Sequence, residues 1–200
     1  GLTHYGDPAD FAWDVVTGVS AGAVNTAFSS VYATGDEVAM TEMLSDQWAH
    51  ISTHDVWTIW PDHPKEAIWN QHGVLNSDPF LKTVTDILTP FGEVKRRFTV
   101  AAVDANSGSY VTFNQDNLEF EEIPQAAVSS SSIPFVWPPQ HFKGYVLMDG
   151  GTTWNVNIPS AVNECLDMGF AEEDIILDVV ICGSHFREGH GVSKSALENF

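Results

Sequence analysis

Apolar and polar residues follow one another along the chain in blocks that predict short strands separated by helices. Residues 12–17 are mostly apolar and rich in β-forming residues, which favours a strand. From Gly22, apolar residues recur at the spacing of one helical face as far as Val31, and Gly35 ends the pattern. A more polar helix is predicted over residues 36–50, followed by an irregular segment.

The rest of the chain continues the alternation of strands and helices. Helices are predicted over residues 79–88 and 159–168, and strands over residues 98–103, 110–113, 145–148 and 175–181. The turn residues 104–108 join the first two of these strands as a hairpin. Strands that alternate with helices imply an α/β fold with a mainly parallel or mixed sheet covered on both faces. We expect one domain over residues 1–200, without linker or repeat.

The turn Gly18-Val19-Ser20-Ala21-Gly22 lies between the first predicted strand and the first predicted helix. A nucleophile elbow requires a serine in this position, held by glycines because side chains at Gly18 and Gly22 would collide with neighbouring backbone. The helix N-terminus behind Ser20 would offer free N–H groups and a positive dipole end to an oxyanion. A turn of small residues between two core elements is the alternative interpretation.

A second candidate feature is Asp149-Gly150-Gly151, directly after the predicted strand 145–148. Sites of open α/β sheets form at the carboxyl ends of strands, so Asp149 and Ser20 are expected to converge at the same sheet edge. A carboxylate within hydrogen-bond reach can remove the proton of a serine hydroxyl. Gly150 and Gly151 would let the backbone pass close to the nucleophile. An ordinary Asp-Gly turn is the simpler interpretation of these three residues.

The chain carries a formal net charge of -19, with only 8 lysine and arginine residues, none of them before Lys65. Such a surface repels nucleic-acid phosphates and anionic lipid headgroups, so binding to either through charge is not expected. An acidic surface also favours solubility, so the charge alone indicates no particular function. No apolar run approaches the ~20 residues that span a bilayer.

The cysteines and histidines form no recognisable metal or disulfide pattern. Cys165 and Cys182 lie in a predicted helix and a predicted strand, and we expect both to be buried and reduced. Reduced cysteines favour an intracellular protein, in the cytoplasm or peripherally on a membrane. Four irregularly spaced histidines are interpreted as surface or loop residues: His50, His54, His63 and His72. No metal and no cofactor is expected, because no histidine pair has the spacing of a zinc site on a helix.

Several segments, in this order, resemble the patatin-like phospholipase family. Residues 18–25 are similar to its nucleophile elbow and following helix, and residues 73–81 to its glycine-to-proline-leucine segment. Residues 106–108 resemble its threonine-glycine hairpin. The small residues and prolines of 127–139 resemble the segment before the family's Asp-Gly-Gly, and residues 149–159 contain that motif with Asn155 and Pro159.

The resemblance implies a three-layer α/β/α sandwich and a Ser–Asp dyad that hydrolyses lipid esters, with no cofactor. Ser20 would attack the ester carbonyl and Asp149 would act as the general base. The substrate would be a phospholipid, lysophospholipid, glycolipid or neutral-lipid ester. An inactive scaffold or interaction domain is the alternative from a different class. A Ser-His-Asp triad using His185 or His190 is a further alternative.

One part of the family pattern is missing before Ser20. Family members carry a glycine-rich loop upstream of the elbow that donates backbone N–H groups to the oxyanion, and Gly1 and Gly6 show no such pattern. We therefore expect the sequence to be a fragment that lacks this loop at its N-terminus. A degenerate homologue, or a protein completed by a second chain, would show the same departure.

Tryptophans are concentrated between Trp48 and Trp69. Amphipathic rings suit a membrane interface, and apolar contact with lipid needs no positive charge. Peripheral membrane contact through Trp57 and Trp60 is therefore one interpretation. A loop packed over the core is the other.

Overall fold

The structure is a computed structural model that describes residues 6–61 and 72–181. Its sheet has five strands: β1 (Val15–Val19), β2 (Arg97–Asp104), β3 (Tyr110–Asn114), β4 (Gln140–Phe142) and β5 (Tyr145–Asp149). The helices are α2 (Ala21–Ser30), α3 (Glu37–His50), α4 (Thr53–Val56), α6 (Asp78–Leu88), α7 (Ile123–Ser130) and α8 (Ile158–Asp167). The predicted helices and the predicted strands up to residue 148 are confirmed, with ends shifted by a few residues.

Strand β2 organises the sheet, because three strands pair with it. Strand β1 runs parallel to β2, with Val19 opposite Ala101, whereas β5 runs antiparallel, with Asp149 opposite Ala102. Strand β3 pairs antiparallel with the middle of β2 and overlaps both partners, so β1 and β5 must share the other edge. The two strands therefore run toward each other along β2 and end at adjacent positions.

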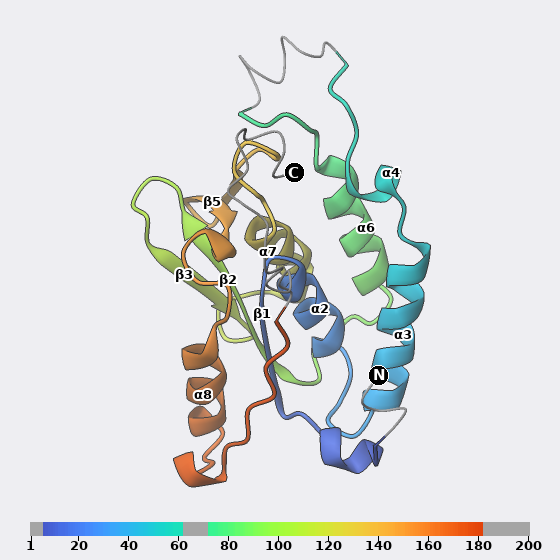
Figure 1. Cartoon of the computed structure of the whole chain (residues 1–200), viewed down its shortest axis with the longest axis vertical. Coiled ribbons are helices and arrows are strands. Elements are labelled where there is room, and N and C mark those ends of the chain that lie inside the picture. The colour runs from blue at the N-terminus through green and yellow to red at the C-terminus, as the bar shows by residue number, and fades with distance from the viewer. Residues whose placement is uncertain (1–5, 62–71, 182–200) are drawn as a thin grey trace, which may run out of the picture.

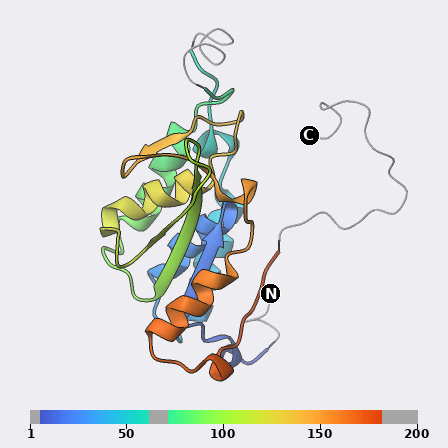
Figure 2. The same cartoon turned by 90° about the vertical axis from the view of Figure 1, so that its left-hand side faces the viewer.

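Helices cover both faces of this mixed sheet, which makes the fold a three-layer α/β/α sandwich (Figures 1 and 2). Helices α2 and α7 pack on one face, with α6 against both of them and α3 against α2, and α8 covers the other face against β1 and β2. Fully buried apolar residues of β2, α2 and α7 form the centre of the core: Phe98, Val100, Val24, Ala27 and Val128.

The predicted strand over residues 175–181 is wrong. The segment is extended, but within the described residues it makes no ladder with a neighbouring strand. Ile176 and Val180 are 90% and 87% exposed, and Asp178 Oδ2 accepts a 2.7 Å hydrogen bond from Trp13 Nε1. An apolar run becomes a strand only where a sheet edge completes its backbone hydrogen bonds. Strand β4, which pairs with β5, had no such signal in its three residues.

A buried carboxylate fastens α8 to the sheet. Glu164, only 4% exposed, accepts hydrogen bonds from Arg97, Thr99, Asn114 and Gln115. Burial by itself raises the pKa of the Glu164 carboxyl, but these side-chain hydrogen bonds outweigh it and hold that pKa below its ordinary value. The ionised form is therefore favoured by folding.

Replacing Glu164 with alanine should destabilise the protein by about 1–3 kcal/mol at pH 7, because one buried donor, Thr99, and three partly buried donors lose their acceptor. The stabilisation that ionised Glu164 gives to the folded state is fully present above the ordinary glutamate pKa of about 4.3. It is lost as the pH falls through the lowered pKa of the folded state. Urea denaturation across this pH range measures it, with the exposed Glu173→Ala as control. Equal destabilisation by both variants would contradict the prediction.

Candidate active site

Ser20 occupies a strained turn between β1 and α2. Its backbone has φ 58° and ψ -130°, a combination that costs a residue with a side chain about 1–3 kcal/mol. The sharp, strained turn expected of a nucleophile elbow is confirmed. Such strain persists only where surrounding contacts determine the backbone position.

The two glycines of the turn have different roles. A Cβ atom on Gly18 would lie 2.0 Å from the carbonyl oxygen of Gly22, so Gly18 is required by close packing of β1 against α2. The corresponding expectation for Gly22 is wrong, because among the described residues, apart from its chain neighbours and the backbone of its own helix, no atom lies within 4 Å of a Cβ placed there. Gly22 contributes its backbone, against which Gly18 packs.

Asp149 meets Ser20 directly. Ser20 Oγ donates a 2.6 Å hydrogen bond to Asp149 Oδ2, and Gly151 N–H donates a 2.7 Å bond to Asp149 Oδ1. A Cβ on Gly150 would lie 2.4 Å from the Ala101 carbonyl oxygen, so the backbone can follow β5 this closely only without a side chain. The expected convergence is confirmed, but it results from two strands that meet end to end.

Burial raises the pKa of the Asp149 carboxyl above its ordinary value, although the hydrogen bonds from Ser20 and Gly151 act in the opposite direction. A carboxylate with a raised pKa is a stronger base toward a serine proton. Because folding favours the protonated form, keeping Asp149 ionised at neutral pH costs folding free energy. A carboxyl group whose pKa burial raises in this way is a candidate functional group.

The C-terminal end of α7 contacts both Ser20 and Asp149, which the sequence reasoning missed. Ser130 Oγ accepts a 2.9 Å hydrogen bond from Ser20 N–H, and Ser131 Oγ donates a 2.8 Å bond to the Ser20 carbonyl. The carbonyl of Ser132 accepts a 2.8 Å bond from Asp149 N–H. The only available signal was the unusual run of four serines at residues 129–132.

Tyr110, at the start of β3, is a second residue that no sequence pattern indicated. Its hydroxyl donates a 3.1 Å hydrogen bond to the Trp154 carbonyl, in the loop that follows Asp149. Burial, and secondarily the negative charge of Asp149, raise the pKa of Tyr110 to about 12. Tyr110 is therefore a neutral hydrogen-bond donor near the carboxylate at every physiological pH.

Asn157, two residues after Asn155, begins helix α8. Its Oδ1 accepts a 3.3 Å hydrogen bond from Ser160 N–H, as a helix N-cap does, and Pro159 lies in the first turn. Asn155 lies instead beside Gly151, where its Oδ1 would be 2.8 Å from an added Cβ. Asn157 is therefore the N-cap of α8, and Asn155 belongs to the loop beside Gly151.

The structure does not describe several of the other candidates. His185, His190, His63, Cys182 and Trp69 lie outside the described residues. The His50 ring contacts Asp46 on α3, and Cys165 is a half-buried free thiol whose pKa burial raises. Among the described residues, no helix combines the length and apolar character that crossing a membrane requires.

Fold and geometry together define an α/β/α protein with a serine–carboxylate pair at a strand-to-helix turn. Residues 2–162 match the patatin-like phospholipase family, and the chain belongs to this family of lipid acyl hydrolases. A search of curated proteins found no match. The resemblance carried by the elbow and the Asp-Gly-Gly motif is thus confirmed at the level of the family.

Replacing each glycine of the elbow with alanine should separate their roles. Gly18→Ala forces a methyl group against the Gly22 carbonyl and should destabilise the protein by about 1–3 kcal/mol. Gly22→Ala places a good helix former in an open position of α2 and should leave stability unchanged or increase it by up to about 1 kcal/mol. Thermal unfolding measures both, and a larger loss in Gly22→Ala would contradict this assignment.

Proposed function

We propose that the protein is a serine acyl hydrolase that cleaves lipid esters through an acyl-enzyme on Ser20, with Asp149 as the general base. The observation that carries the proposal is the 2.6 Å hydrogen bond from Ser20 Oγ to Asp149 Oδ2. A base must lie within about 2.6–3.2 Å of the proton's heavy atom. Membership of the patatin-like phospholipase family supports the same assignment.

In the proposed first step, Asp149 takes the Ser20 proton as Oγ attacks the ester carbonyl carbon. The tetrahedral intermediate collapses when its bond to the leaving alcohol oxygen breaks, and Asp149 returns the proton to that oxygen. Water then attacks the acyl-enzyme, giving its proton to Asp149. Breaking the bond between Oγ and the acyl carbon releases the fatty acid, and the proton returns to Ser20.

Developing negative charge on the carbonyl oxygen requires N–H donors. Because the N–H of Ser20 is bonded to Ser130 Oγ, the donors left at the elbow are those of Ala21 and Gly22 in the first turn of α2. These groups have no acceptor within the helix and lie at the positive end of its dipole. Ala21, directly after the nucleophile, holds the usual elbow donor position.

Two other functions remain as alternatives. A non-catalytic scaffold of the same family would keep the fold without turning over an ester. A Ser-His-Asp triad would need His185 or His190 between the serine and the carboxylate. The direct bond between Ser20 and Asp149 favours the dyad, because in a triad the imidazole occupies this position.

Ser20→Ala and Asp149→Asn should each abolish esterase activity of the full-length protein without unfolding it. A fluorophosphonate probe should label the wild-type protein and fail to label Ser20→Ala, because the probe forms its bond with an activated serine oxygen. Circular dichroism checks the fold of each variant. Wild-type protein that is folded and never labels would favour the scaffold, and loss of labelling in His185→Ala or His190→Ala would favour the triad.

The rate of the proposed reaction should depend on the ionisation of Asp149. Because burial raises the pKa of this carboxyl, kcat/KM on a soluble ester should fall with decreasing pH at a midpoint above about 3.9, the ordinary aspartate value. The fluorophosphonate labelling rate should fall over the same range. A midpoint at or below about 3.9, in protein that is still folded, would argue against Asp149 as the base.

Peripheral contact with a lipid surface is part of the proposal. Three segments near the site contain no charged residue, although the whole chain carries a net charge of -19: residues 57–61, 73–76 and 133–139. We call them the uncharged rim. Backbone hydrogen bonds join them, from Thr58 to Asn76 and from Val74 to Phe135. Phe135 lies three residues after Ser132, hence within about 11 Å of the residue that bonds Asp149.

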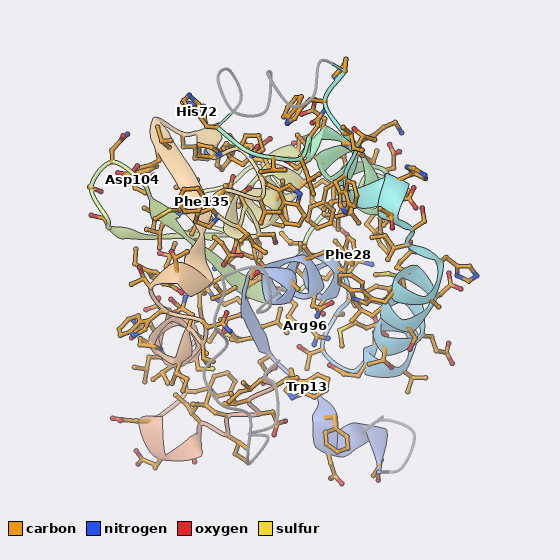
Figure 3. All side chains as sticks on the ribbon, turned by 45° about the horizontal axis from the view of Figure 1, so that its top comes forward. Trp13, Phe28, His72, Arg96, Asp104 and Phe135 are labelled. Carbon is orange, nitrogen blue, oxygen red and sulfur yellow. The ribbon has the colours of Figure 1, made fainter. Side chains whose placement is uncertain are left out.

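Apolar side chains project from this rim into solvent. Phe135, labelled in Figure 3, is 86% exposed and has φ 68°, a backbone conformation that an aromatic residue rarely adopts. Ile59 and Val74 are 62% and 50% exposed. Trp57 and Trp60 are half-buried, and the Trp60 indole donates a 3.0 Å bond to the Gly73 carbonyl. The exposed apolar residues of the rim are therefore Phe135, Ile59, Val74 and Ile133, which is 43% exposed.

Phe135→Ser combined with Val74→Ser should lower binding to phosphatidylcholine vesicles and hydrolysis of vesicle lipid, while activity on a soluble ester persists. Contact without charge should depend little on salt and should not be strengthened by anionic lipid. Vesicle sedimentation and the two assays measure this. Val38→Ser, exposed on the first turn of α3, is the control. Equal losses on vesicles and on the soluble ester would refute the contact.

The same proposal includes an intracellular location, in the cytoplasm or on the surface of a membrane. It is supported by the free thiol of Cys165.

A further inference from the structure

We propose that Ser130 is a positioning residue whose hydroxyl holds the nucleophile Ser20 in its reactive place. The inference rests on the proposed hydrolase function and adds to it a residue from a different element, 110 positions away in the sequence. Ser130 lies at the last position of α7 and is fully buried. It contacts the backbone of the elbow and not the Ser20 hydroxyl.

The two hydrogen bonds of Ser130 fix the direction of its hydroxyl. Its Oγ donates a 2.5 Å bond to the Ala101 carbonyl of β2 and accepts a 2.9 Å bond from Ser20 N–H. A carbonyl can only accept and an amide N–H can only donate, so the hydroxyl has a single satisfactory orientation. Ser130 thus links the nucleophile to the strand along which β1 and β5 meet.

The elbow needs such a link because its backbone is strained. With φ 58°, Ser20 would relax toward a more favourable conformation if its amide were released. Relaxation would move Oγ from its position 2.6 Å from Asp149 Oδ2. Asp149 is itself held by its N–H bond to the Ser132 carbonyl, so one end of α7 sets the position of both partners.

Helix α7 also provides a matched control. Ser129 is also fully buried, and its Oγ donates a 2.7 Å bond to the Gln125 carbonyl of the same helix. Removing this hydroxyl deletes a buried hydrogen bond of α7 without touching the elbow. Ser129→Ala and Ser130→Ala therefore remove the same atom from neighbouring buried positions.

The test compares kcat, KM and the fluorophosphonate labelling rate of the two variants on a soluble ester. We expect Ser130→Ala to lower kcat and the labelling rate by on the order of 10–100-fold with KM unchanged, because misplacement of a reacting group by about 1 Å has effects of this size. Ser129→Ala should stay within about twofold of wild type. If Ser130→Ala does not fold, Ser130→Cys replaces the hydroxyl with a somewhat larger thiol, which is only a weak acceptor, and should show the same loss.

Equal kcat in folded Ser130 and Ser129 variants would overturn the inference, as would a rise in KM with kcat unchanged. Hydrogen exchange at the Ser20 amide, measured by NMR, gives a second readout that needs no activity. We expect exchange at this amide to be faster in Ser130→Ala and unchanged in Ser129→Ala; unchanged exchange in both would overturn the inference. A wild-type protein without activity but with this exchange difference would refute the proposed function and leave the positioning role standing.

Discussion

The sharing of one edge of β2 by two strands of opposite direction is the constraint on which the site depends. Strand β1 arrives at Ala101 and β5 at Ala102, and neither can extend further without displacing the other. Each strand must therefore end at this point, β1 at the elbow of Ser20 and β5 at Gly150. Gly150 lies against the Ala101 carbonyl, where no side chain fits, and the elbow is linked to the same carbonyl through the Ser130 hydroxyl.

Much of this arrangement was readable from the sequence because it depends on local signals. Glycines beside Ser20, the alternation of strands with helices and the Asp-Gly-Gly motif predicted the turn, the layers and the pair of side chains. The direction of β5 was not readable, since its four apolar residues, 145–148, form a strand equally well in either direction. The prediction of a strand over residues 175–181 was wrong for a related reason, because a β-forming run does not specify which sheet edge it pairs with.

The role of the hydroxyls at residues 129–132 could not be predicted from the sequence, because small polar residues usually indicate turns or solvent exposure. Here they are buried at the end of a helix, and each hydroxyl has a partner. Satisfying buried polar groups in this way lets α7 pack tightly on the sheet while it remains polar toward the elbow. One segment of the uncharged rim, residues 133–139, follows directly in the chain and therefore connects the proposed dyad with the proposed lipid contact.

The separation of Ser20 and Asp149 along the chain has a consequence for folding. The two residues are 129 positions apart, and they meet only after β1 and β5 have both docked on β2. Pairings over such distances are slow to form, because the chain must close long loops before the contacts repay the lost entropy. The proposed nucleophilic reactivity of Ser20 should therefore appear among the last events of refolding, after the helices have formed. The time course with which a serine-specific reagent labels Ser20 during refolding would then report when the sheet is complete.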